Sequence, residues 1–211
     1  MSRLENDQFY IQTHGKASSA PAKKRLAKAM ALLLQGKDFN SITTAEISRT
    51  ASANEALIYR YFKDKRGLLH QVLHDYLLEF MNQVQHDLQK TRGAINKLRL
   101  LIQAHISVYD NNRVFAKILL LEARSFPGYF ESETYRLVKI YGKMIIDIIQ
   151  EGIEEGQIRS DIPAVQIRNL ILGGIEHFCL APVIFGDDIP VDSAAEQLST
   201  LIFQGITTKS A

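Results

Sequence analysis

Residues 51–65, ASANEALIYRYFKDK, combine many polar and aromatic side chains in one short stretch. Two tyrosines and an arginine lie on one short predicted helix, and two lysines follow at its end. Phenol, ammonium and guanidinium groups bind phosphate oxygens, and guanidinium and carboxylate groups also bind base edges. The stretch therefore indicates contact with a nucleic acid.

The apolar residues of this stretch predict which of its side chains are free. Ile58 and Phe62 are four residues apart, so both lie on the buried side of a helix that Asn54 caps. The residues that remain are expected to face outward: Glu55, Ala56, Tyr59, Arg60 and Lys63.

These side chains suit two kinds of contact with DNA. A guanidinium pairs with guanine O6 and N7, a carboxylate accepts from cytosine N4, and a small side chain lets a thymine methyl approach. The residues with these properties are Arg60, Glu55 and Ala56. Side chains suited to phosphate oxygens are Tyr59, Tyr61 and Lys65.

The elements before this helix predict a helix-turn-helix. Pro21 suits the start of a first helix and Gly36 its end. Thr43 and Glu46 have capping-box spacing and open a second helix. A short turn at 52–54 joins it to the third helix, which would enter the major groove.

Charge is distributed unevenly along the chain. Residues 1–70 hold twelve Lys/Arg against six Asp/Glu, a balance of +6, and residues 71–211 hold thirteen against seventeen, a balance of −4. A basic N-terminal third favours a polyanionic partner, with chance fluctuation as the alternative. Basic residues on the first turns of the first helix oppose its dipole, so local helix stability does not explain them: Lys23, Lys24, Arg25 and Lys28.

Residues 42–69, ITTAEISRTASANEALIYRYFKDKRGLL, resemble the TetR family of transcriptional regulators. The resemblance is specific over about residues 22–70 and implies a ligand-responsive repressor that acts as a homodimer on a palindromic operator. By position it implies phosphate contacts from Thr43, Tyr59, Tyr61 and Lys65. The expected DNA-binding set is Thr43, Thr44, Asn54, Glu55, Ala56, Leu57, Tyr59, Arg60, Tyr61 and Lys65.

Two positions depart from the family pattern. Ser52 stands in the turn where the family usually has glycine, which is tolerable if its φ is negative. Ala56 and Leu57 stand where a Gly-Thr pair is usual, so the operator preference of a relative does not transfer. The structural alternative is a helical corner with an aromatic cap.

The whole chain is expected to be all-α, with about nine helices. We expect an N-terminal arm at 1–19, the DNA-binding domain at 20–66, and a larger ligand-binding and dimerisation domain at 67–211. Asp64 caps a long fourth helix. Turn residues separate five further helices, near 94–110, 112–125, 131–156, 163–184 and 191–206.

The last two helices are the predicted homodimer surface. The helix at 163–184 is apolar nearly all round, and Gly173 and Gly174 allow another helix to approach. The helix at 191–206 supplies a second apolar stripe, and two such helices per subunit form a four-helix bundle. The alternative is that both are interior to a monomer.

The effector site is expected among the helices from about 68 to 156. Its candidates are polar groups on apolar stripes: His105, Tyr109, Glu122, Arg124 and Tyr141. Aromatic residues could form apolar walls: Phe115, Phe126, Tyr129 and Phe130. This composition favours a largely apolar small-molecule effector, although a lone histidine on an apolar face is more often a satisfied core residue.

Other chemistry finds little support. His70 and His74 have metal-ligand spacing without an identifiable third ligand, so we expect no metal and no cofactor. Cys179 excludes a disulfide framework, suits a reducing cytoplasm and has no visible base partner. Motifs of catalysis are missing, so we expect no enzyme.

A membrane role is not expected either. The first twenty residues are polar and do not form a signal peptide. The most apolar run carries Glu176 and His177 at its centre, where a bilayer tolerates them poorly. The expected location is therefore the cytoplasm.

One alternative from another class stays open, a helical small-molecule-binding protein or enzyme without DNA binding. Charge placement separates the two hypotheses, since DNA binding requires the basic residues of the N-terminal helices to share one surface. The sequence does not decide between repressor and activator, and it names neither the effector nor the operator.

Overall fold

The computed structural model describes residues 21–208, so the expected arm at 1–19 lies outside the described residues. Nine α-helices account for most of this range, and its only β pairing is an isolated bridge between Ile158 and Thr207. The all-α expectation is confirmed for this part of the chain. The α-helices are α2 (Pro21–Leu34), α3 (Thr44–Thr50), α4 (Ala56–Phe62), α5 (Lys65–Lys90), α6 (Ala94–Asn111), α7 (Arg113–Lys117), α8 (Glu133–Glu154), α9 (Ala164–Phe185) and α10 (Val191–Ile206).

Three short helical turns complete the described elements. They are the 3₁₀ turns η1 (Phe39–Ser41) and η3 (Pro127–Glu131) and the π-helical turn η2 (Ile118–Ala123). The helix expected at 112–125 is therefore not continuous, because α7 gives way to η2. Ile118, Leu119 and Leu120 are all buried, and three successive buried positions span about 200° of an α-helix. Periodicity could not identify the helix type there.

The described residues group into two compact units. The first unit joins residues up to 79 with 118–137, and the second unit joins 80–117 with the residues from 138 onward. Segment 118–137 belongs to the first unit because it packs on the start of α5, where the buried Thr134 hydroxyl donates to the His70 carbonyl at 3.0 Å. The units differ in extent from the domains expected at 20–66 and 67–211, which remain a prediction.

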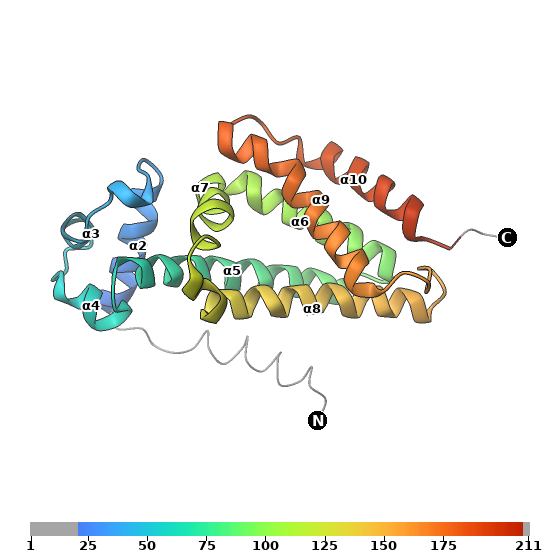
Figure 1. The fold of residues 1–211 in the computed structure, drawn as a ribbon, viewed down its shortest axis with the longest axis horizontal. Helices are drawn as coiled ribbons and strands as arrows, with labels where there is room; N and C mark the ends of the chain where they lie inside the picture. Colours follow the sequence, from blue (N-terminus) through green and yellow to red (C-terminus); the bar gives the residue numbers. More distant parts are fainter. Residues whose placement is uncertain (1–20, 209–211) are drawn as a thin grey trace, which may run out of the picture. The chain divides into compact units, whose positions relative to one another are not determined.

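The N-terminal helices of the first unit pack around α2, which contacts both α3 and α4 (Figure 1). Leu26 and Met30 of α2 are fully buried, as are Ile47 of α3 and Ile58 of α4. Ala51, at the end of α3, is also buried, so the small side chain lets the neighbouring helices approach. One apolar core therefore sets the arrangement of the helix-turn-helix.

The second unit is built on α6, which contacts both α9 and α10 (Figure 1). Lys97 of α6 and Glu151 of α8 form a half-buried ion pair at 2.6 Å. Near this pair a Cβ added to Gly152 would come within 2.8 Å of the Ala94 Cβ, so the start of α6 and the end of α8 are in close contact.

The α3–α4 turn carries local backbone strain. Ser52 has a φ of 48°. The sequence-based condition for a tolerable serine, a negative φ, is therefore not met. Left-handed backbone costs a non-glycine residue about 1–2 kcal/mol. The glycine usual in the TetR family at this position would avoid that cost.

Ser52→Gly is therefore expected to raise the free energy of unfolding by about 1 kcal/mol. Denaturant unfolding followed by circular dichroism measures the change. Ser160→Gly is the matched control, because this exposed serine does not have a positive φ and the change there should destabilise. Equal effects of the two substitutions would contradict the strain at Ser52.

Candidate functional site

Helix α4 exposes one polar face, as the spacing of its apolar residues predicts. Ile58 and Phe62 are buried, whereas Ala56 and Arg60 are exposed and Tyr59 is 55% exposed. A phenol, a guanidinium and a small side chain are thus available on one side of a short, well-anchored helix. The partly buried residues of the predicted set on this helix are Leu57 and Tyr61.

The start of α4 is tied to α3 by side-chain hydrogen bonds. Asn54 Oδ1 accepts from the Ala56 backbone N–H at 2.8 Å, which confirms the predicted cap. The Thr44 hydroxyl donates to Glu55 Oε1 at 2.5 Å and so links the two helices. Thr44 therefore orients Glu55, one carboxylate oxygen of which is already engaged inside the protein.

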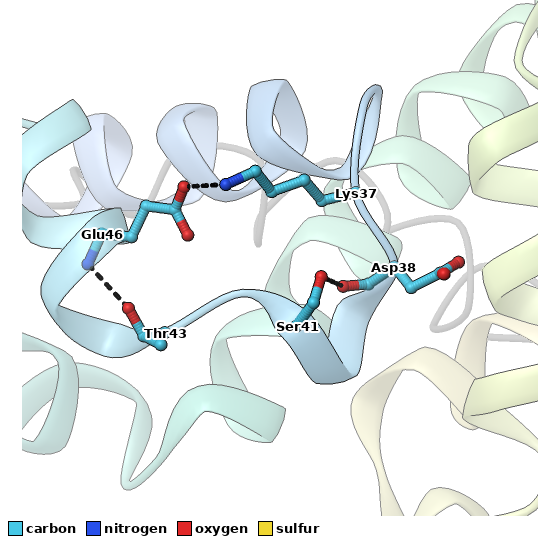
Figure 2. Close-up of polar contacts among 5 residues, drawn as sticks. All are labelled: Lys37, Asp38, Ser41, Thr43 and Glu46. Carbon is cyan, nitrogen blue, oxygen red and sulfur yellow. Dashed lines mark hydrogen bonds and ion pairs between the residues drawn. The ribbon is translucent and has the colours of Figure 1, made fainter.

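The start of α3 is held by a cap and an ion pair (Figure 2). Thr43 Oγ1 accepts from the Glu46 backbone N–H at 3.2 Å, which is one half of the predicted capping box. Glu46 does not complete the box, because its carboxylate pairs with Lys37 at 2.5 Å. The hydrogen bond from Lys37 is the main reason that the pKa of Glu46 lies below its usual value.

The ammonium of Lys65 makes contacts inside the first unit. It donates to the carbonyls of Phe39 at 2.9 Å and Ile42 at 2.7 Å, and it lies 4.4 Å from the centroid of the Phe39 ring. Burial, followed by the charge of Arg66, lowers the pKa of Lys65. Two of its three donors are used in this way, so phosphate contact by Lys65 remains a prediction.

Two basic residues of α2 lie beside α3 and α4. The ammonium of Lys23 is 5.6 Å from the centroid of the Phe62 ring, and Arg25 Nε donates to the Ala51 carbonyl at 3.1 Å. Lys24 and Lys28 are exposed. The first helix thus brings positive charge to α3 and α4, as DNA binding requires.

Three of the five predicted effector residues meet in the second unit. The Tyr141 hydroxyl lies 3.3 Å from His105 Nδ1, and the His105 ring is 4.9 Å from the ring of Tyr109 and 5.5 Å from that of Tyr141. The ring of Phe80, a residue that the sequence did not suggest for this site, has its centroid 5.5 Å from that of the Tyr141 ring. Burial, and secondarily the neighbouring Tyr109, raises the pKa of Tyr141, so its phenol stays neutral.

The remaining predicted effector residues belong to the first unit. Glu122 and Arg124 are half-buried in and just after η2. The predicted walls are likewise divided, with Phe115 in the second unit and Phe126, Tyr129 and Phe130 in the first. Tyr129 packs against the rings of Phe130 at 5.4 Å and Tyr135 at 5.3 Å.

Metal and thiol chemistry have little basis in residues 21–208. No group of three histidine, cysteine, aspartate or glutamate side chains able to hold a metal occurs in this range. His74 Nδ1 lies 3.3 Å from an oxygen of Asp75. Cys179 is fully buried, and burial, with Asp110 second, raises its pKa to about 11. Its thiol is therefore neutral at physiological pH.

Helices α9 and α10 present apolar side chains to solvent. Phe185 is 77% exposed and Leu201 is 71% exposed. Further exposed apolar residues of α9 are Val165, Leu170, Phe178 and Ile184. By length and composition α9 could cross a membrane, and only 28% of its most apolar window is buried.

Replacing Lys65 tests its contacts inside the first unit. Lys65→Met should lower the free energy of unfolding by about 1–3 kcal/mol, because two carbonyls lose their donor. Denaturant unfolding provides the measurement. Lys63→Met, at an exposed lysine two residues away, is the control and should change stability by less than about 0.5 kcal/mol. A Lys65 variant as stable as this control would show that the two hydrogen bonds of Lys65 do not stabilise the fold.

Comparison with known proteins covers nearly the whole chain. Residues 26–72 match the family model described as bacterial regulatory proteins, tetR family, and residues 73–205 match that of the YsiA-like protein, C-terminal region. The uncharacterized HTH-type transcriptional regulator YvkB of Bacillus subtilis is 36% identical, over 89% of this chain and 98% of that protein. The fatty acid metabolism regulator protein of Bacillus subtilis is 22% identical, over 90% of this chain and 97% of that protein.

A solved structure has the same fold. The transcriptional regulator FadR from Bacillus subtilis, in complex with stearoyl-CoA, superposes with a TM-score of 0.78 at 22% identity. The match covers 87% of this chain and 98% of that one.

Proposed function

The chain belongs to the tetR family of bacterial regulatory proteins, and from this premise we propose that it is a ligand-responsive repressor. It acts as a homodimer on a palindromic operator in the cytoplasm, by binding rather than by catalysis. An effector with a long apolar body releases it from DNA.

The exposed face of α4 carries the DNA-binding part of this proposal. Arg60 and Tyr59 are free to reach a major groove, and Ala56 leaves room for a base methyl. Thr44 presets Glu55 beside them through its hydrogen bond. A helical corner with an aromatic cap would instead bury these rings, yet Tyr59 is 55% exposed.

Homodimerisation through α9 and α10 would cover their exposed apolar side chains. Monomeric soluble proteins rarely expose large apolar patches without a partner. Gly173 of α9 and Gly205 of α10 have open space where a Cβ would be, which suits close helix approach. A membrane is a poorer partner for α9, because Glu176 and His177 interrupt its apolar sequence.

Two-fold symmetry also meets a requirement of DNA reading. Paired recognition helices bind half-sites about one helical turn apart, so a ligand that changes their separation releases the operator. The chain passes from the first unit to the second within α5, which supplies a covalent connection between them.

An acyl thioester is the effector class that we propose. FadR of Bacillus subtilis has been solved with stearoyl-CoA, and this chain shares its fold. The aromatic cluster of Phe80, His105, Tyr109 and Tyr141 combines apolar ring faces with three polar groups, one imidazole and two phenols. That composition suits a long chain with one polar function.

DNA binding is tested by selecting bound duplexes from a random pool at about 150 mM salt. The parent should enrich a palindrome. Arg60→Ala should weaken binding to that duplex by about ten- to hundredfold and relax base preference, because one bidentate base contact is lost. Arg92→Ala, at an exposed arginine after α5, should bind like the parent. Failure to enrich any sequence would contradict DNA reading by α4.

The dimer surface is tested by charge insertion. Leu201→Glu should convert dimers into monomers in sedimentation velocity, since burying an unpaired carboxylate is costly. Leu32→Glu is the matched control, because Leu32 of α2 is also more than half exposed and lies in the first unit. A Leu201→Glu protein that stays dimeric would exclude this part of α10 from the interface.

The effector class is tested on the selected duplex. Stearoyl-CoA should release the protein from DNA in a fluorescence anisotropy titration, whereas CoA without an acyl chain should not. Release by CoA alone would contradict an effector recognised through its apolar chain.

A further inference from the structure

Arg66 and His70 lie near the start of α5, outside the exposed face of α4. They are four residues apart and therefore share one helix face. Both meet the same aromatic ring, because Arg66 Cζ lies 4.8 Å and the His70 ring 6.1 Å from the centroid of Phe126. All three residues belong to the first unit.

Three nitrogen atoms of this pair are buried without a hydrogen-bond partner among residues 21–208. They are Arg66 Nη1 and both ring nitrogens of His70. Buried polar groups are nearly always hydrogen-bonded, and an unmet buried donor on a charged group is especially costly. The contacts of Arg66 with the rings of Phe39, at 5.2 Å, and Phe126 attract its charge but accept no in-plane N–H bond.

Among residues 21–208, no carboxylate accepts a hydrogen bond from these three nitrogens. Asp64 is the nearest acidic influence on His70, but its carboxylate caps α5 by accepting from the Gly67 N–H at 2.7 Å. Burial, then the charge of Arg66, lowers the pKa of His70, so its imidazole is neutral and keeps one N–H to donate. Arg66 Nη1 and one ring nitrogen of His70 thus remain as unmet N–H donors on two side chains that both lie against Phe126.

An apolar surface adjoins these donors. Phe126 is 39% exposed and Phe130 is 56% exposed. The His70 ring stacks on the Tyr129 ring, with their centroids 6.3 Å apart. The Tyr129 ring in turn packs against the Phe130 ring, with a centroid distance of 5.4 Å. Donors beside exposed aromatic rings match an amphipathic anion, which has an oxyanion at one end and an apolar body behind it.

We propose that Arg66 and His70 bind the oxyanion of an amphipathic ligand, a carboxylate or a phosphate, whose apolar body lies against Phe126. This site deepens the proposed function, since it rests on the protein being ligand-responsive and names the anionic group of the effector. The guanidinium supplies a charged donor, and the neutral imidazole supplies the second N–H.

Arg66 is next in sequence to a residue that contacts the segment before α3. Lys65, next to Arg66, donates to the carbonyl of Ile42, which directly precedes the Thr43 cap of α3. A ligand that moves the first turn of α5 therefore acts on the start of α3. The first unit contains both the anion site and this tie.

Isothermal titration calorimetry of the full-length protein without DNA tests the site, with four probes: decanoate, octyl phosphate, decanol and inorganic phosphate. One or both amphipathic anions should bind at least about tenfold more tightly than decanol, because decanol has no charge to meet the guanidinium. Comparison of decanoate with octyl phosphate identifies the oxyanion, and inorganic phosphate measures the headgroup alone.

Arg66→Gln and His70→Gln should each weaken binding of the preferred anion by about ten- to hundredfold. Matched controls are Arg92→Gln and His86→Gln, exposed residues that should bind like the parent. His70→Phe keeps a ring against Tyr129 and removes both nitrogens, so it retains the test if His70→Gln does not fold.

Decanol binding as tightly as the anions would overturn the proposal, and so would Arg66→Gln or a folded His70 variant that binds the anion like the parent. Because the titration contains no DNA, a protein that binds these anions but no operator would refute the repressor and leave the anion site standing. Operator release by an acyl thioester without anion binding at Arg66 would do the reverse.

Discussion

The arrangement of α3 and α4 depends on two hydrogen bonds that the ammonium of Lys65 donates. This ammonium binds the carbonyls of Phe39 and Ile42, which lie 26 and 23 residues earlier in the chain, and so joins the first turn of α5 to the segment that leads into α3. Arg25 fixes the other end of α3 through the Ala51 carbonyl. Cations from α5 and α2 thus hold both ends of a seven-residue helix that is too short to be stable alone.

From this fixed helix the orientation of α4 follows. Thr44 and Glu55 connect the two helices by a hydrogen bond, and buried Ile58 and Phe62 set the rotation of α4 about its axis. Tyr59 and Arg60 are left exposed as a result. Preorganisation of this kind lowers the entropy lost on binding, because these exposed side chains are carried by a helix already held in place.

Local patterns carried the prediction of this surface, and contacts between distant residues limited it. The spacing of Ile58 and Phe62 was enough to predict the exposed face of α4, because a helical repeat depends only on near neighbours. The partners of Lys65 were not predictable, since they lie more than twenty residues away and are backbone atoms. Sequence likewise suggested a phosphate ligand at Lys65 where the fold uses most of its donors internally.

The effector region shows the same division. His105 and Tyr109 are one turn apart on α6, so their proximity was evident, whereas Phe80 joins them only through the tertiary fold. The inclusion of 118–137 in the first unit was equally hidden, because η2 has no 3.6-residue repeat. The sequence of Arg66 and its neighbours did not suggest a binding role, because the burial of its unpartnered Nη1 depends on the tertiary fold.

A regulator of this design needs two surfaces of opposite character. The polar face of α4 suits reversible binding to DNA, while the apolar faces of α9 and α10 suit a lasting association between two chains. An effector can alter DNA binding only to the extent that it binds one arrangement of the two reading helices better than another. We therefore propose that two copies of α4 read two half-sites at a fixed separation.

Hydroxyl-radical footprinting of the selected duplex measures that separation directly. The proposed arrangement of two α4 helices predicts two protected blocks on one face of the DNA, related by two-fold symmetry, with centres about 34–36 Å apart or a multiple of that distance. A single protected block, or uniform protection along the duplex, would contradict it.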